Sequence, residues 1–241
     1  MLKDSLFSQK QECIEDFHFG KDTAIVFDDM LVRSVPFYGE LQRMMAEMAA
    51  DYAVEGSSLY DLGCSTCSTF LELDPVLPKN LRFVGIDFSS EMLDRAREKL
   101  SQNGFTRHHE LICADLNELV SIENASVVIM NLALQFIRPV RRAQVMKNIA
   151  TGVNKGGCLL VIEKLLSKDS QFNRSFIKYY YDLKRRNGYS DLEIAQKREA
   201  LENVLIPYRL EENFELFLDS GFKECEVFFR WYNFCGMIAT K

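Results

Sequence analysis

Three aspartates in the first half of the chain could hold one ligand between them. Asp61, Asp87 and Asp115 each end a short apolar segment of the kind that forms a buried strand. The carboxyl ends of parallel strands meet at one edge of a sheet, and an acid at the end of the second strand typically accepts hydrogen bonds from ribose hydroxyls. Gly63 allows the sharp turn and close backbone approach that such a site requires. The pattern predicts a nucleoside-containing ligand at this edge.

The turn after the first of these strands argues against a nicotinamide cofactor. A dinucleotide site needs G-x-G-x-x-G, whereas residues 63–68 read GCSTCS, with one glycine. S-adenosylmethionine has no pyrophosphate, so it does not need three close backbone approaches. We expect Asp61 near its methionine amino group, Asp87 at the ribose hydroxyls and Asp115 near the adenine amine. Because a single acid at a strand end can equally cap the next helix, the prediction rests on all three together.

Cysteine and histidine patterns give weaker signals. Cys64-x-x-Cys67 could be a redox pair or half of a metal site, but no second half lies nearby in the sequence. Seven cysteines without a framework spacing favour free thiols in a reducing compartment. His108 and His109 are expected in an exposed polar loop, and the three histidines form no metal or nucleophile constellation. We therefore predict that no metal is bound.

Strands and helices alternate along the chain, which predicts an α/β fold with a parallel sheet covered on both faces. A hairpin at the C-terminus must then place at least one strand antiparallel. We predict a seven-stranded, mostly parallel sheet of the class I methyltransferase, Rossmann-like type. The expected strands are 58–61, 82–87, 111–115, 125–131, 158–163, 224–231 and 234–240, and the main expected helices are 41–52, 66–73, 89–100, a helix opening at Pro139, and 210–220.

Two segments extend this sheet within what we expect to be a single domain over residues 1–241. Residues 1–54 are predicted to form an N-terminal arm that is largely helical. Residues 165–210 are charged, aromatic and helical, with Asn187-Gly188 between two helices and a Ser190–Glu193 capping box opening the second. This segment is too long for a simple connection, so we expect a helical lid or a dimerisation insert.

Composition limits the classes of partner. The net charge is −6 and no run of about 18 apolar residues occurs, so we expect neither a direct nucleic-acid contact nor a membrane span. The first residues carry charges where a signal peptide needs an apolar core. These observations favour a cytoplasmic protein with a small-molecule ligand.

Five stretches of the sequence resemble the carboxy-S-adenosyl-L-methionine synthase family. The similarity extends over essentially the whole chain, and the pattern at 187–204 is specific to that family rather than to methyltransferases in general. The stretches are RSVPFY at 33–38, YDLGCS at 60–65, ENASVVIMNLALQF at 123–136, NGYSDLEIAQKREALENV at 187–204 and the terminal WYNFCGMIATK.

The resemblance implies a methyltransferase fold that does not methylate. Members of the family condense S-adenosylmethionine with prephenate to give carboxy-S-adenosylmethionine and phenylpyruvate, and the product serves a separate enzyme that carboxymethylates a tRNA wobble uridine. The resemblance also implies a homodimer in which Arg198 holds the transferred carboxylate and can reach the neighbouring subunit's site. It places the remaining contacts to S-adenosylmethionine on Tyr38, Gly63, Cys64, Ser65, Asp87, Phe88, Asp115, Leu116 and Asn131.

The chain departs from the family pattern at two positions of this site. Cys67 stands where glycine is expected, and Phe88 stands where a polar residue is expected after the ribose-binding acid. The residues by themselves indicate only an S-adenosylmethionine-dependent protein. An ordinary small-molecule methyltransferase and a non-catalytic protein that binds S-adenosylmethionine are therefore the alternatives.

Overall fold

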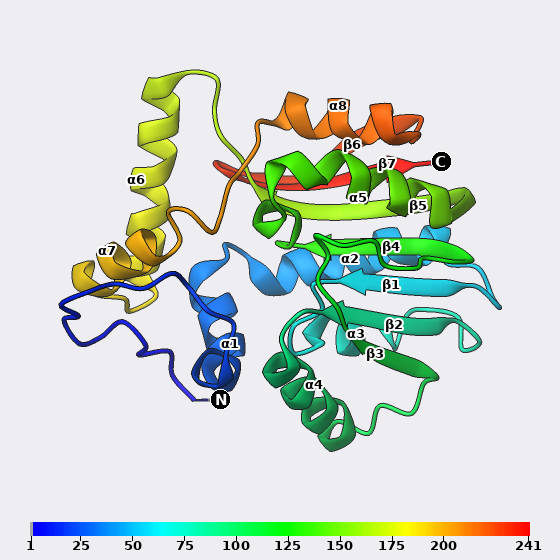
Figure 1. Ribbon diagram of the computed structural model, residues 1–241, viewed down its shortest axis with the longest axis horizontal. Coiled ribbons are helices and arrows are strands. Elements are labelled where there is room, and N and C mark those ends of the chain that lie inside the picture. Colours follow the sequence, from blue (N-terminus) through cyan, green and yellow to red (C-terminus); the bar gives the residue numbers. More distant parts are fainter. Residues whose placement is uncertain (1) are drawn as a thin grey trace.

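The computed structural model, which describes residues 2–241, contains one seven-stranded sheet with the order β3-β2-β1-β4-β5-β7-β6 (Figure 1). The first five strands are parallel to one another, and β7 runs antiparallel to both β5 and β6. The predicted fold class is confirmed, including the terminal hairpin. The strands are β1 (Ser58–Leu62), β2 (Arg82–Asp87), β3 (His109–Cys113), β4 (Ala125–Asn131), β5 (Val153–Lys164), β6 (Glu224–Trp231) and β7 (Phe234–Thr240).

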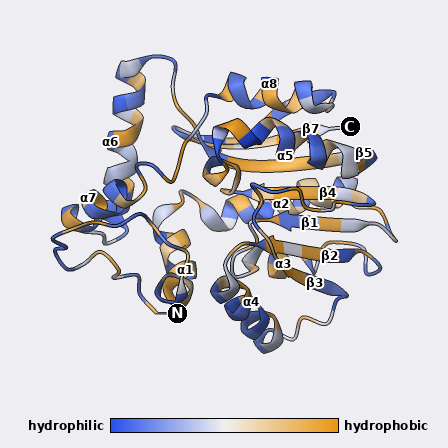
Figure 2. Ribbon diagram, in the orientation of Figure 1, coloured by the Kyte–Doolittle hydropathy of each residue, from blue (hydrophilic) through white to orange (hydrophobic). Residues whose placement is uncertain are grey.

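Helices cover both faces of this sheet. On one face α2, α3 and α4 pack against side chains such as Leu59 and Val127, and on the other face α5 and α8 pack against their chain neighbours Tyr60 and Val128. Strands β4 and β5 carry continuous apolar runs, drawn in orange in Figure 2, as expected for strands buried on two sides. The helices are α1 (Lys21–Ser34), α2 (Tyr38–Tyr52), α3 (Ser68–Leu73), α4 (Ser90–Gln102), α5 (Pro139–Gly152), α6 (Ser170–Arg186), α7 (Asp191–Ala200) and α8 (Leu210–Ser220).

Several element boundaries differ from the prediction. The third strand runs from His109 to Cys113, two residues earlier than expected, so Asp115 lies in the following loop. His109 is therefore a strand residue, and its ring packs edge-on against Phe105. The fifth strand begins at Val153 rather than Cys158, since Ala125 pairs with Val153 across a bulge.

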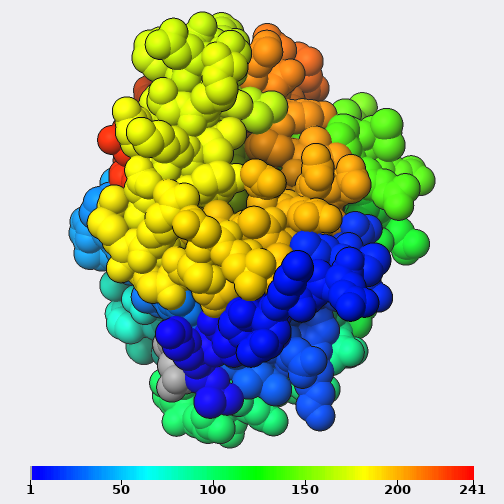
Figure 3. All heavy atoms as spheres, turned by 90° about the vertical axis from the view of Figure 1, so that its left-hand side faces the viewer, coloured from blue at the N-terminus to red at the C-terminus, as the bar shows by residue number. Residues whose placement is uncertain are grey.

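The N-terminal arm and the insert lie against each other beside the sheet. Residues 2–20 contain no helix or strand and run along the insert, as the dark blue and yellow surfaces of Figure 3 show. Gln196 of α7 donates hydrogen bonds to the carbonyls of Phe7 and Gln9, and the Phe17 amide donates to the carbonyl of Ala200. The predicted capping box of α7, formed by Ser190 and Glu193, is present.

None of the helices formed by residues 2–241 has the length and apolar character needed to cross a membrane.

Candidate active site

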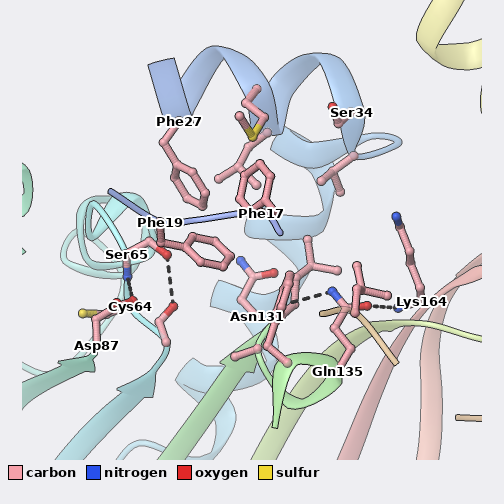
Figure 4. A pocket seen from close by; sticks show the side chains of 18 of the residues that line it. Phe17, Phe19, Phe27, Ser34, Cys64, Ser65, Asp87, Asn131, Gln135 and Lys164 are labelled. Atoms are coloured by element: carbon pink, nitrogen blue, oxygen red, sulfur yellow. Dashed lines mark hydrogen bonds between the residues drawn. The ribbon is translucent and has the colours of Figure 1, made fainter. Parts of the chain in front are cut away.

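One pocket lies at the carboxyl edge of the parallel strands, between the sheet, α1 and the insert (Figure 4). Nine of the ten site residues expected from the family resemblance line it. They come from the start of α2, the turn after β1, the ends of β2 and β4, and the loop after β3: Tyr38, Gly63, Cys64, Ser65, Asp87, Phe88, Asp115, Leu116 and Asn131.

The turn after β1 is fixed by its backbone. Gly63 has φ 82°, and a Cβ atom at this position would lie 2.6 Å from the Cβ atom of Ala133. The amides of Gly63 and Cys64 both donate to the carbonyl of Ile86 on β2, at 2.7 and 3.1 Å. Only glycine combines this left-handed conformation with this close approach, so the single glycine of the turn is structurally required.

The backbone conformation at Cys67 accounts for the glycine that the family pattern has at this position. It has φ 56° and ψ 32°, in the left-handed region where glycine is favoured, and it is fully buried. A hydrogen bond to Cys67 and burial together raise the pKa of the Cys64 thiol, and both thiols are free. Among residues 2–241 no group of three or more His, Cys, Asp or Glu side chains is arranged to hold a metal ion.

Asp87 joins the turn to the start of α4. Its Oδ2 accepts from the Ser65 amide and its Oδ1 accepts from the Ser89 amide, both at 2.9 Å. Burial raises the pKa of Asp87, and these hydrogen bonds act in the opposite direction by favouring the carboxylate. Ser89 is the N-cap of α4 and donates its hydroxyl to the carbonyl of Phe19, which brings the arm to the rim of the pocket.

Asp61 lies beneath the pocket rather than in its wall. It is 1% exposed and neither of its carboxylate oxygens has a hydrogen-bond partner among the described residues. Burial and, secondly, the charge of Asp87 raise the pKa of Asp61 to about 7. Because Asp61 does not line the pocket, its expected place near the methionine amino group stays a prediction.

The unpartnered carboxylate yields a stability prediction for Asp61→Asn. An aspartate titrates near pH 3.9 in the unfolded chain, and Asp61 titrates at about 7 in the folded protein. The unfolded state therefore binds fewer protons between these values, so the wild-type protein loses stability as pH rises from about 4 to about 7. Asparagine lacks this charge but keeps a buried polar group, so we expect a gain on the order of 2 kcal/mol at pH 8 and a smaller gain at pH 5.

Urea unfolding of the ligand-free protein at both pH values measures this gain. Equal gains at pH 5 and pH 8 would contradict ionisation as the cause. The same substitution should lower the affinity for S-adenosylmethionine, because the uncharged asparagine no longer attracts a cation.

Several residues of the pocket were missed by the sequence analysis. Lys164 ends β5, and Lys197 precedes Arg198 on α7; both line the pocket. Phe19 of the N-terminal arm also lines it and contacts Phe88 edge-on at 5.7 Å between ring centroids. A lysine at a strand end is a detectable signal, because strand ends in this fold meet at the ligand edge.

Arg198 is the one expected site residue outside the pocket. It is exposed on α7, whereas its neighbour Lys197 is buried and turned toward the pocket. Adjacent residues on a helix lie about 100° apart, so both side chains cannot point to the same place. Within one chain, Arg198 does not complete the site.

Sheet order, terminal hairpin and edge pocket together define a class I methyltransferase fold. A sequence profile described as "Methyltransferase domain" matches residues 59–157. A putative S-adenosylmethionine-dependent methyltransferase from Methanococcus maripaludis has a TM-score of 0.62 at 16% identity, covering 96% of this chain and 97% of its own. Human N-acetylserotonin methyltransferase has a TM-score of 0.62 at 15% identity, covering 90% of this chain and 57% of its own.

Full-length relatives define the family more narrowly. The carboxy-S-adenosyl-L-methionine synthase of Methylococcus capsulatus is 53% identical over 100% of both chains. The protein of the same name from Sulfurimonas denitrificans is 42% identical, again over 100% of both chains. The chain belongs to the carboxy-S-adenosyl-L-methionine synthase family.

Proposed function

We propose that this protein converts S-adenosylmethionine and prephenate to carboxy-S-adenosylmethionine and phenylpyruvate. The observation that carries the proposal is the charge distribution of the pocket. Asp61, Asp87 and Asp115 lie in or beneath one end and form no ion pair among residues 2–241, whereas Lys164 and Lys197 lie at the other end. A cationic sulfonium compound and an acidic partner are the ligands that such a pocket suits.

The acidic end fits S-adenosylmethionine. We propose that the Asp87 carboxylate accepts hydrogen bonds from the ribose hydroxyls and that the methionine part lies against the turn at Gly63, since both residues line the pocket. We propose that Tyr38, Cys64, Ser65, Phe88, Asp115, Leu116 and Asn131 complete this contact surface. When bound, S-adenosylmethionine supplies a weakly acidic sulfonium methyl group, which can take up carbon dioxide once it has lost a proton.

The proposed reaction places modest demands on the protein. Prephenate becomes aromatic when it loses carbon dioxide and its ring hydroxyl, and the hydroxide released can accept the methyl proton, giving water. The protein must therefore hold the reactants together, exclude water and retain carbon dioxide, rather than supply a strong base. Phe17 and Phe19 of the arm, together with residues of the insert, cover the pocket in a way that serves this purpose.

We further propose that the active form is a homodimer and that residues 165–210 serve as its lid. Arg198 would then bind the new carboxylate in the partner's pocket, since a guanidinium offers two parallel hydrogen bonds to a carboxylate. The net negative charge fits a protein that does not bind tRNA itself. We propose that it acts in the cytoplasm, where its product would supply a second enzyme that modifies the tRNA wobble uridine.

Incubation of the protein with S-adenosylmethionine and prephenate, followed by mass spectrometry, tests the proposal. The expected result is a product heavier than S-adenosylmethionine by one carboxyl substituent, formed together with phenylpyruvate. Formation of S-adenosylhomocysteine with an added acceptor would instead support the small-molecule methyltransferase. Binding of S-adenosylmethionine without any turnover would support a non-catalytic protein.

A further inference from the structure

The basic end of the pocket is distant from the end assigned to S-adenosylmethionine. Lys164 lies at the carboxyl end of β5, and Asp87 lies at the end of β2. The sheet order places β5 three strands away from β2, about 14 Å at the usual spacing of about 4.8 Å between strands. Figure 4 shows the two side chains at opposite sides of the pocket, with the Lys164 ammonium extending into it. The two ends can therefore hold different molecules.

Neither pocket lysine has a good partner among residues 2–241. Lys197 is 6% exposed, and its Nζ atom makes no hydrogen bond. The carboxylate oxygen paired with it, Oδ2 of Asp4, is 3.7 Å away and already accepts a hydrogen bond from the Tyr189 hydroxyl at 2.6 Å. Lys164 Nζ forms no ion pair and lies 4.7 Å from the centroid of the Tyr180 ring. An ammonium held in this way costs free energy that an anionic ligand would recover.

The lysines also affect one another. Burial, together with the neighbouring positive charge of Lys184 on α6, lowers the pKa of Lys164 and of Lys197 to about 7, while Asp4 and Glu163 only partly oppose this. Lys184 itself does not line the pocket, and burial lowers its pKa to about 8. A carboxylate placed between the two pocket lysines would favour their charged forms, so an acidic ligand and protons would bind together.

We infer that Lys164 and Lys197 bind a carboxylate of the second substrate, a ring-containing dicarboxylic acid. The surrounding side chains suit its ring: Tyr180 and Phe234 lie against Lys164, and Phe17 lies against Lys197. Aromatic walls bury the ring, while the two ammonium groups fix its orientation. This inference rests on the proposed function, in which the acid is prephenate.

The chemistry selects which of the two carboxylates the lysines hold. The ring carboxylate of prephenate leaves as neutral carbon dioxide, so an ion pair to it would stabilise the ground state over the transition state and slow the reaction. The side-chain carboxylate is retained in phenylpyruvate, and an ion pair to it persists throughout. Lys164 and Lys197 therefore bind the side-chain carboxylate, and they contribute to binding rather than to the chemical step.

Steady-state kinetics and calorimetry of Lys164→Met and Lys197→Met test this assignment. We expect each substitution to raise the KM for prephenate and the Kd for phenylpyruvate about 10- to 100-fold, the effect of losing one charge-assisted contact. The value of kcat should change little, because the lost ion pair stabilises the bound substrate and the transition state equally. The Kd for S-adenosylmethionine should stay within about twofold, which also shows that the variant is folded. Lys184→Met is the control for loss of a buried lysine outside the pocket: removing its charge favours the charged forms of Lys164 and Lys197, so binding of neither ligand should weaken.

The two proposals fail in different ways. If the wild-type protein forms no carboxylated product, the proposed function is wrong, and phenylpyruvate binding still tests the lysines. If the wild-type protein turns over but both lysine variants keep their KM and their Kd for phenylpyruvate, the subsite is wrong. A loss confined to kcat would also overturn it, because the lysines would then act on the group that is transferred.

Discussion

Asp87→Ala is expected to weaken S-adenosylmethionine binding at least about 100-fold. In the proposed function this carboxylate binds the ribose, and its two oxygens also accept hydrogen bonds from the Ser65 and Ser89 amides at 2.9 Å. Hydrogen bonds to a charged group contribute about 1.5–3 kcal/mol each, so loss of two ribose contacts alone accounts for this factor. The variant also frees the turn at residues 63–67, which increases the cost of ordering it around the ligand.

Isothermal titration with S-adenosylmethionine measures the effect, and thermal unfolding of the ligand-free variant shows whether the fold survives. Because burial raises the pKa of Asp87, its ionised form is already disfavoured in the folded state, and its removal should leave the protein folded. Asp94→Ala is the matched control: Asp94 is an exposed acid on α4, paired with Arg97, and its loss should change neither property. Binding by Asp87→Ala within tenfold of wild type would exclude the ribose role.

The sequence predicted element boundaries best where a local pattern, such as an apolar run or a capping glycine, coincides with burial in the folded protein. The segment Ala125–Asn131, with its apolar run Val127–Met130, forms β4 with the predicted ends, and Gly221 ends α8 in the left-handed conformation expected of a C-cap. The third strand was placed two residues late because its apolar residues are interrupted by Glu110. Strand ends therefore located the ligand edge, but they did not fix the depth of each acid: Asp61 is buried beneath the turn, whereas Asp115 is exposed.

The basic end of the pocket could not be predicted in the same way. Lys197 stands in a charged helical segment that reads as a solvated face, and its burial arises only when Asp4 and Phe17, almost 200 residues earlier, fold over it. The spacing of apolar residues along α7 cannot predict such a long-range contact. Similarly, the left-handed backbone at Cys67 and the close approach of Gly63 to Ala133 are properties of the tertiary fold.

Arg198→Ala is expected to abolish formation of the carboxylated product, by about 1,000-fold or more, while S-adenosylmethionine binding is retained. In one chain the Arg198 side chain is exposed and lies outside the pocket. If it binds the transferred carboxylate, it must therefore do so in a partner's pocket. Loss of a two-pronged contact to a developing carboxylate in a site closed to water removes on the order of 4 kcal/mol of transition-state stabilisation. Arg198→Lys should recover little, since an ammonium cannot reproduce both hydrogen bonds.

Mixing two inactive variants decides whether Arg198 acts across the dimer. At S-adenosylmethionine concentrations too low to saturate its weakened site, Asp87→Ala keeps the arginine but leaves its own pocket empty, and Arg198→Ala keeps the pocket but lacks the arginine. If Arg198 serves the partner's pocket, each mixed dimer has one intact site, so equal mixing with random reassociation should restore about a quarter of wild-type activity. If it serves its own pocket, no site is intact and activity stays at the level of the separate variants. Activity restored in proportion to the mixed dimer, measured by mass spectrometry of the product, would show that the assembly completes the site that a single chain leaves open.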